Sequence, residues 1–202
     1  MGAEDAVKTV HLVVFDGFAD WEPAFALAEV RRSGGLEVET VGFTGVPVRS
    51  MGGLSVVPDR TLEGVEPERV RLLLLPGGDA WEAGAYPRTG LEALLRALVT
   101  RRVPIAAICG ATLAVARAGL LDDRAHTSNE AGWLDRLSPE YAGAARYIDA
   151  LAARDRGVIT ASGLGPTEFA REIFEELGIF SDADRSLWYQ LFKYGRFPEP
   201  AA

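Results

Sequence analysis

Strand-length runs of apolar residues alternate along the chain with segments of helical periodicity. The runs are rich in aliphatic and β-branched residues, which is typical of strands buried on both faces of a sheet. We expect four such strands in the first part of the chain, over Val7–Phe15, Leu36–Phe43, Arg71–Leu75 and Val103–Ile108. Strands that alternate with helices imply a mostly parallel sheet, covered by helices on both faces and connected by right-handed crossovers.

The helices are indicated by apolar spacing and by signals at their ends. We expect them over residues 20–32, 90–102, 111–118, 166–176 and about 183–194. Asp20 is the expected N-cap of the first helix, which places Glu22 in its first turn. The last helix carries an apolar stripe, which we expect to pack into the core rather than to form an interface. Its members are Leu187, Trp188, Leu191 and Phe192.

Smaller features are expected between these elements. Met51-Gly52-Gly53 lies between two short apolar segments and indicates a hairpin. Two late strands are expected over residues 147–152 and 158–161, and a short strand is expected to end at His126. His11 lies within the first strand and is expected to be a core or edge histidine with satisfied hydrogen bonds.

The single cysteine, Cys109, lies where an apolar strand gives way to a helix. Ala107 and Ala111 flank it two positions away, so the local pattern is small-x-Cys-x-small, the pattern of a nucleophile elbow. Bulky residues at these positions would collide as strand and helix approach across a strained turn. The first free amides of the helix are expected to lower the pKa of the thiol. The alternative is an inert, buried cysteine.

The carboxyl ends of parallel strands meet at one edge of a sheet, where α/β proteins carry their sites. On this edge we expect Cys109, Glu22 and the turn that contains Gly77 and Gly78. Two consecutive glycines indicate either a tight turn alone or bare amides that would hold an oxyanion together with the amide of Gly110. Glu22 either complements the helix dipole at the surface or leans toward Cys109.

Composition and charge narrow the class of partner. The 202 residues suit one domain, with a core over about residues 7–177 and a helical extension over about 181–195. A formal net charge of −8 without a basic stripe argues against nucleic acid. No apolar run is long enough to span a membrane, and the N-terminal residues are acidic where a signal peptide is basic.

One cysteine forms no internal disulfide, which fits a reducing compartment, so we expect a cytoplasmic protein. With two histidines and a single cysteine in the chain, neither a metal site nor a cofactor is expected.

Three segments resemble the ThiJ/PfpI superfamily, the class I glutamine amidotransferase-like proteins that include the parkinsonism-associated deglycase. They are Leu-Pro-Gly-Gly at 75–78, Ala-Ile-Cys-Gly-Ala at 107–111 and the segment at 157–170. The resemblance runs from Val10 to about Leu177, and the last helix is similar to that of a bacterial branch labelled amidase or glutamine amidotransferase. It implies a flavodoxin-like three-layer α/β/α sandwich, usually a homodimer.

The resemblance also implies roles for individual residues. Cys109 would be the nucleophile, and Glu22 would be the acid that hydrogen bonds its sulfur. Gly77, Gly78 and Gly110 match the positions of an oxyanion hole.

Other candidate residues fit less well. Asp20 is the alternative to Glu22, and Thr127 and Gly163 are expected to line the site. Family peptidases place a histidine directly after the cysteine, where this chain has Gly110, and glutamine amidotransferases have a downstream His-x-Glu pair that this chain lacks. His126 is then the one histidine left near the site as a candidate base.

Three functions fit these observations. In the first, Cys109 attacks a small-molecule carbonyl such as an α-oxoaldehyde or a glycated adduct, a glyoxalase-like or deglycase-like activity. In the second, the protein is a non-catalytic sensor or protective protein in the stress response, and Cys109 oxidises to a sulfinate stabilised by Glu22. In the third, it is an intracellular peptidase, amidase or amidotransferase for an amide substrate, which the missing histidine argues against.

Overall fold

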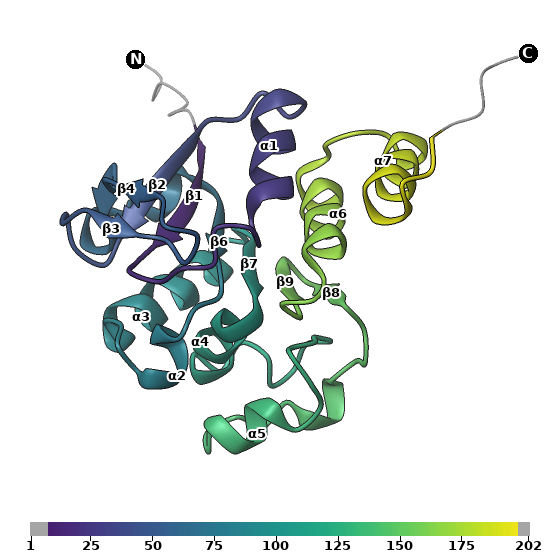
Figure 1. The fold of residues 1–202 in the computed structure, drawn as a ribbon. Coiled ribbons are helices and arrows are strands. Elements are labelled where there is room, and N and C mark those ends of the chain that lie inside the picture. Colours follow the sequence, from purple (N-terminus) through teal and green to yellow (C-terminus); the bar gives the residue numbers. More distant parts are fainter. Residues whose placement is uncertain (1–7, 198–202) are drawn as a thin grey trace, which may run out of the picture.

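Figure 1 shows the computed structural model, which describes residues 8–197. Its main sheet has seven strands in the order β5-β2-β1-β6-β7-β9-β8. Their bounds in that order are Arg60–Thr61, Val38–Gly42, Thr9–Val14, Val70–Leu75, Ile105–Ile108, Val158–Ala161 and Ala152–Asp155. All neighbouring strands are parallel except β8, which pairs antiparallel with β9.

Two helical layers cover the sheet, because its central strands are buried on both faces. One layer contains α1 (Ala24–Arg32) and α6 (Pro166–Leu177), which pack against each other, with α7 (Asp182–Tyr194) outside α6. The other contains α3 (Arg88–Thr100), α4 (Thr112–Arg117) and the short α2 (Ala80–Ala83). This is the flavodoxin-like α/β/α sandwich that the sequence predicts.

Short elements complete the described part of the chain. The strands β3 (Val48–Arg49) and β4 (Ser55–Val56) form the predicted hairpin, and α5 (Trp133–Leu137) lies in the long segment between α4 and β8. One-turn 3₁₀ segments occur at Leu62–Gly64, Pro67–Arg69, Cys109–Ala111 and Ala144–Arg146. No helix of the described residues has both the length and the apolar composition to cross a membrane.

Several local predictions were wrong. The segment expected to form a strand over residues 147–152 begins a strand only at Ala152, and the strand expected to end at His126 is a single bridge to Tyr147. The sequence also did not indicate α2, α5 or β5. β5 is only two residues long, so it is too short to show a hydrophobic pattern in the sequence. Its position is fixed by the preceding residue, Asp59, whose carboxylate accepts hydrogen bonds from the N–H and hydroxyl of Thr40 at 2.7 Å.

The apolar stripe on α7 is only partly core. Trp188 is buried, packs edge-on against Phe25 and Phe174, and donates a hydrogen bond from Nε1 to Glu29 at 3.1 Å. Leu187 and Phe192 are each 42% exposed. The buried indole of Trp188, together with the contacts of Tyr189 and Lys193 to Glu168, attaches the extension to the α1–α6 layer. His11 is buried as predicted, with its Nε2 3.3 Å from a Glu39 carboxylate oxygen.

A buried aromatic cluster supports the turn after β6. The ring of Trp81 lies 5.1 Å from Phe15, 5.9 Å from Phe43 and 5.0 Å from Tyr86, measured between ring centroids. Its Nε1 donates to the carbonyl of Pro76 at 2.8 Å, directly before the two glycines of the turn. The cluster therefore fixes the backbone that lies beside Cys109.

We expect Trp81→Ala to lower the free energy of unfolding by about 3–5 kcal/mol, since it leaves a cavity among the aromatic rings. Trp81→Phe keeps most of the packing but leaves the Pro76 carbonyl without its donor, and should cost about 1–3 kcal/mol. Urea denaturation measures both. Trp21→Phe, at an indole that is 49% exposed, is the control. A Trp81→Phe protein as stable as this control would contradict the role of the hydrogen bond.

Candidate active site

Cys109 lies in the sharp turn between β7 and α4, as predicted for an elbow. Its φ is +57°, a left-handed conformation that non-glycine residues rarely adopt. Ala107 and Ala111 on either side are fully buried, in agreement with the need for small residues where strand and helix converge. The cysteine itself is half-buried. The surrounding fold therefore holds a strained residue with its sulfur partly accessible.

Glu22 lies in the turn before α1 and is 2% exposed. Its Oε2 accepts a hydrogen bond from the Gly77 N–H at 2.5 Å, and its carboxyl lies beside Cys109. A Cβ on residue 77 would lie 2.7 Å from Glu22 Oε2 and 2.8 Å from Cys109 Cβ. Only glycine at position 77 lets the carboxyl and the cysteine approach each other.

Asn129 is a site residue that the sequence analysis missed. Its Nδ2 donates to Cys109 Sγ at 3.6 Å, and its Oδ1 accepts from the Gly163 N–H at 3.1 Å. Gly163 borders the sulfur as expected, since a Cβ there would lie 3.0 Å from Sγ. The sequence signal for Asn129 was the polar run at 126–129, from which the sequence analysis predicted His126 and Thr127 instead.

The structure places His126 in a different role from the predicted base. It is fully buried, its Nδ1 lies 2.8 Å from the Arg124 carbonyl, and its Nε2 lies 2.7 Å from the Tyr141 hydroxyl. A carbonyl only accepts, so Nδ1 carries the hydrogen and Nε2 accepts from Tyr141. Burial lowers the pKa of His126 and raises that of Tyr141 to about 12, so both groups are neutral near pH 7. With both nitrogens engaged, His126 does not serve Cys109.

Thr127 and Asp20 are also used elsewhere. Thr127 donates from Oγ1 to the Ala150 carbonyl at 2.6 Å, which anchors its loop. The Asp20 carboxylate accepts hydrogen bonds from Ser50 Oγ at 2.7 Å and the Gly52 N–H at 3.2 Å. Asp20 thus holds the hairpin loop, with no capping hydrogen bond to α1, and Glu22 is the acid at the sulfur.

The three glycines proposed for an oxyanion hole differ in their hydrogen bonds. The Gly77 amide is already bonded to Glu22, so it is not available to a substrate. Gly110 directly follows Cys109, and its amide acts to lower the pKa of the thiol. Gly78 has a φ of +148° that favours glycine, and a Cβ on Gly110 would lie 3.2 Å from its carbonyl oxygen. Gly78 and Gly110 therefore lie next to each other.

The electrostatics of the site differ from the expected lowered thiol pKa. Burial raises the pKa of the Cys109 thiol to about 11, and the negative charge of Glu22 adds to the rise. Hydrogen bonds from Asn129 and Gly110 oppose it. Burial also raises the pKa of Glu22. The helix amides are therefore outweighed, and the Cys109 thiol keeps its proton near pH 7.

A cavity adjoins the cysteine through Asn129. It has a volume of about 300 Å³, and its wall includes Tyr147, Ser162 and the exposed Leu164. Ser162 directly precedes Gly163, so this wall is continuous with the backbone at the sulfur. The cavity provides space for a small molecule at the carboxyl edge of the sheet. Within residues 8–197, no cluster of three His, Cys, Asp or Glu side chains is arranged to hold a metal ion.

Comparison with known proteins agrees with this architecture. Two crystal structures superpose closely on the chain. The DJ-1 superfamily protein Atu0886 from Agrobacterium tumefaciens has a TM-score of 0.86 at 35% identity, covering 94% of this chain and 100% of that one. The thiJ/pfpI family protein from Bacillus anthracis has a TM-score of 0.84 at 32% identity, covering 96% and 94%.

The sequence comparisons point to the same group. YoaZ from Bacillus subtilis (strain 168), described as an uncharacterized protease, is 34% identical over 196 residues, which are 92% of this chain and 91% of YoaZ. Residues 8–176 match the model of the DJ-1/PfpI family. The chain therefore belongs to the DJ-1/PfpI family.

Proposed function

We propose that this protein is a cysteine-dependent enzyme that converts small electrophilic carbonyl compounds such as α-oxoaldehydes. The observation that carries the proposal is the buried Glu22 carboxyl, held against the Cys109 thiol by the Gly77 N–H. The adjoining cavity of about 300 Å³ suits a substrate of a few carbon atoms. Membership of the DJ-1/PfpI family supports a cysteine chemistry without naming the substrate.

In the proposed reaction, Glu22 acts as the general base. As Cys109 Sγ attacks the aldehyde carbon, the thiol proton moves to the Glu22 carboxylate, and the carbonyl oxygen becomes an oxyanion that accepts from the amides of Gly78 and Gly110. The oxyanion then takes a proton, which gives a hemithioacetal.

The later steps need no external oxidant. Glu22 moves a proton from the former aldehyde carbon to the neighbouring keto carbon, so the first carbon is oxidised and the second is reduced. The product is a thioester on Cys109. Water hydrolyses this thioester, which releases a 2-hydroxy acid and restores the thiol. The net reaction is the addition of one water molecule to an α-oxoaldehyde.

The raised pKa of Glu22 suits this role. A general base works best when its pKa lies near the working pH, and burial moves a carboxyl in that direction. The thiol is held protonated until substrate arrives, so a base beside it is required. Glu22 therefore acts both as the base that deprotonates the thiol and as the group that carries the proton in the later step.

A peptidase or amidase activity is less well supported. Release of an amine needs an acid that protonates the leaving nitrogen, a role that histidine commonly fills beside a nucleophilic cysteine or serine. Here His126 is bonded to Arg124 and Tyr141, and Gly110 follows the cysteine. An aldehyde has no leaving group and avoids this requirement.

Asn129 and Gly110 favour oxidative sensing as the second candidate function. Both place hydrogen-bond donors at the sulfur of Cys109, where a sulfinate would carry oxygens that accept from them. A mass gain of two oxygens confined to Cys109 under mild peroxide, in a protein without carbonyl turnover, would favour sensing over catalysis. The homodimer that the family resemblance implies also remains a proposal.

Cys109→Ser and Glu22→Gln should each reduce methylglyoxal consumption by at least about 100-fold, since each removes one partner of the proton transfer. The measurement is loss of methylglyoxal with formation of lactate. Glu63→Gln, at an exposed acid, is the matched control and should consume methylglyoxal at the wild-type rate. Turnover that survives in Cys109→Ser would contradict the proposal.

Glu22→Gln should make Cys109 more reactive toward iodoacetamide while abolishing turnover. Removing the carboxylate charge lowers the pKa of the thiol, and each unit gives about tenfold more thiolate below the pKa. The experiment is the pH dependence of alkylation in both proteins. Slower alkylation in Glu22→Gln would mean that the native carboxyl is protonated and stabilises the thiolate, contrary to the assignment above.

Glu22 should also make stability depend on pH. Its pKa is raised in the folded protein above 4.5, so the folded state binds the proton more tightly. The resulting stabilisation is present below about pH 4.5 and is lost as the pH rises through the folded pKa, at about 1.4 kcal/mol per unit. In urea denaturation, the free energy of unfolding of Glu22→Gln should therefore rise relative to that of wild type from about pH 4 to pH 8, whereas that of Glu63→Gln should not. A constant difference would contradict the raised pKa.

A further inference from the structure

A second cavity lies at the edge of the sheet opposite Cys109. Its volume is about 370 Å³, and its wall includes Val103, two residues before β7, and Gly157, directly before β9. Those two strands are parallel, and Cys109 follows the far end of β7. This cavity, the arginine pocket, is therefore separate from the proposed active site.

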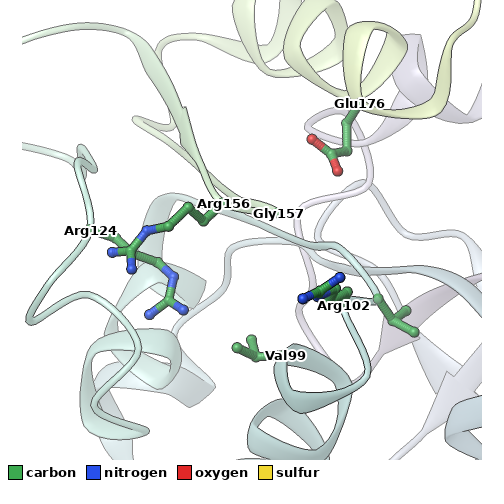
Figure 2. Close-up of a pocket in the computed structure, with 7 residues that line it drawn as sticks. Val99, Arg102, Arg124, Arg156, Gly157 and Glu176 are labelled. Carbon is green, nitrogen blue, oxygen red and sulfur yellow. The ribbon is translucent and has the colours of Figure 1, made fainter.

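Three guanidinium groups line the arginine pocket. Figure 2 shows Arg124 and Arg156 on one side and Arg102 on the other, with Val99 between them. Such a grouping is unusual in a chain with a formal net charge of −8. Val99 and Val103 add apolar surface to the wall of the pocket.

The protein leaves part of this donor capacity unused. Arg124 has a side chain only 13% exposed, and its Nη1 donates to Leu120 and Asp123. Its buried Nε has no acceptor among the described residues. The Arg102 side chain is exposed and is paired with no acceptor among residues 8–197. A buried donor such as Arg124 Nε is costly when it is unpaired, and an acceptor from a ligand would satisfy it.

The three arginines of the pocket differ in their ion pairs. Arg156 pairs with Asp123 at 3.0 Å and Asp155 at 3.4 Å, and Arg124 shares Asp123. The remaining acid at the wall, Glu176, pairs with Arg154 at 3.1 Å, a guanidinium outside the pocket that also pairs with Glu172 and Glu175. Of the three lining arginines, Arg102 is the one that makes no ion pair within residues 8–197.

Two of these arginines also occupy strained backbone positions. Arg102 has a φ of +57° just after α3, where glycine is the usual residue, and Arg156 has a φ of +48° in the β8–β9 turn. The other non-glycine residues with positive φ in the described chain are Cys109 and Phe180. Strained residues concentrate at functional sites, and one of these four is the proposed nucleophile.

We propose that the arginine pocket binds a small phosphate monoester with an apolar body. The phosphate accepts hydrogen bonds from the guanidinium groups of Arg102 and Arg124, which present planar sets of donors to such oxyanions. The apolar body lies on Val99 and Val103. Glu176 repels a second anionic group, which favours a ligand with a single charged head. The volume lies within the range of small-molecule sites.

Isothermal titration calorimetry of the full chain with phenyl phosphate tests this assignment. We expect saturable binding at one site, weakened about tenfold or more in Arg102→Gly, since a charged, bidentate contact is lost. Glycine favours the left-handed backbone at position 102, so the melting temperature of this variant should not fall. Arg101→Gln is the matched control, because it removes the same charge from the neighbouring residue, which does not line the pocket. Its affinity should stay within about twofold of wild type.

The comparison ligands decide the chemistry. Inorganic phosphate should bind several-fold more weakly than phenyl phosphate, because it lacks the apolar body, and benzoate should also bind more weakly, because it carries a single charge. No saturable binding of phenyl phosphate, or equal weakening in both variants, would overturn the site. Benzoate or inorganic phosphate binding as tightly as phenyl phosphate would overturn the phosphate-monoester assignment.

Discussion

The chemistry of this protein depends on one contact, in which a backbone N–H holds a buried carboxyl against a thiol. The Gly77 amide fixes Glu22 from one side, and the absence of a Cβ at that position lets Cys109 approach from the other. Much of the surrounding structure serves this arrangement. The aromatic cluster around Trp81 holds the turn, and the strained elbow directs the sulfur toward the carboxyl.

Burial of the pair determines its protonation. In water a glutamate would be ionised and a cysteine neutral over a wide pH range, with little influence on each other. Burial raises the pKa values of both groups, and the negative charge of Glu22 raises the pKa of Cys109 further. In the proposed reaction, this pair supplies base catalysis at Cys109 without the histidine that family peptidases place after the cysteine.

Much of the architecture follows from local sequence. The buried strands, the hairpin and the elbow at Cys109 were predicted, because each depends on residue type and spacing over a few positions. The strand-end argument allowed Glu22 to lie at the same sheet edge as Cys109, and the resemblance to the ThiJ/PfpI superfamily implied that it is the acid at the sulfur. The pKa of the thiol was predicted with the wrong sign, because the depth of burial around Cys109 depends on the whole fold.

The residues that the sequence did not reveal depend on the path of long loops. Asn129 reaches the sulfur, whereas His126, three residues earlier, turns into a network with Tyr141. Nothing in local spacing distinguishes the two. The arginine pocket is a similar case, since Arg102, Arg124 and Arg156 come together only through the packing of three separate connections.

The most direct test is a titration of the two groups themselves, by NMR of protein labelled with ¹³C at the glutamate carboxyl carbons and at the cysteine Cβ. We expect the Glu22 carboxyl to titrate above 4.5, and Cys109 to lose its proton only at high pH, with an apparent pKa near 11. A Cys109 thiolate already present near pH 7 beside a protonated Glu22 carboxyl would contradict the account.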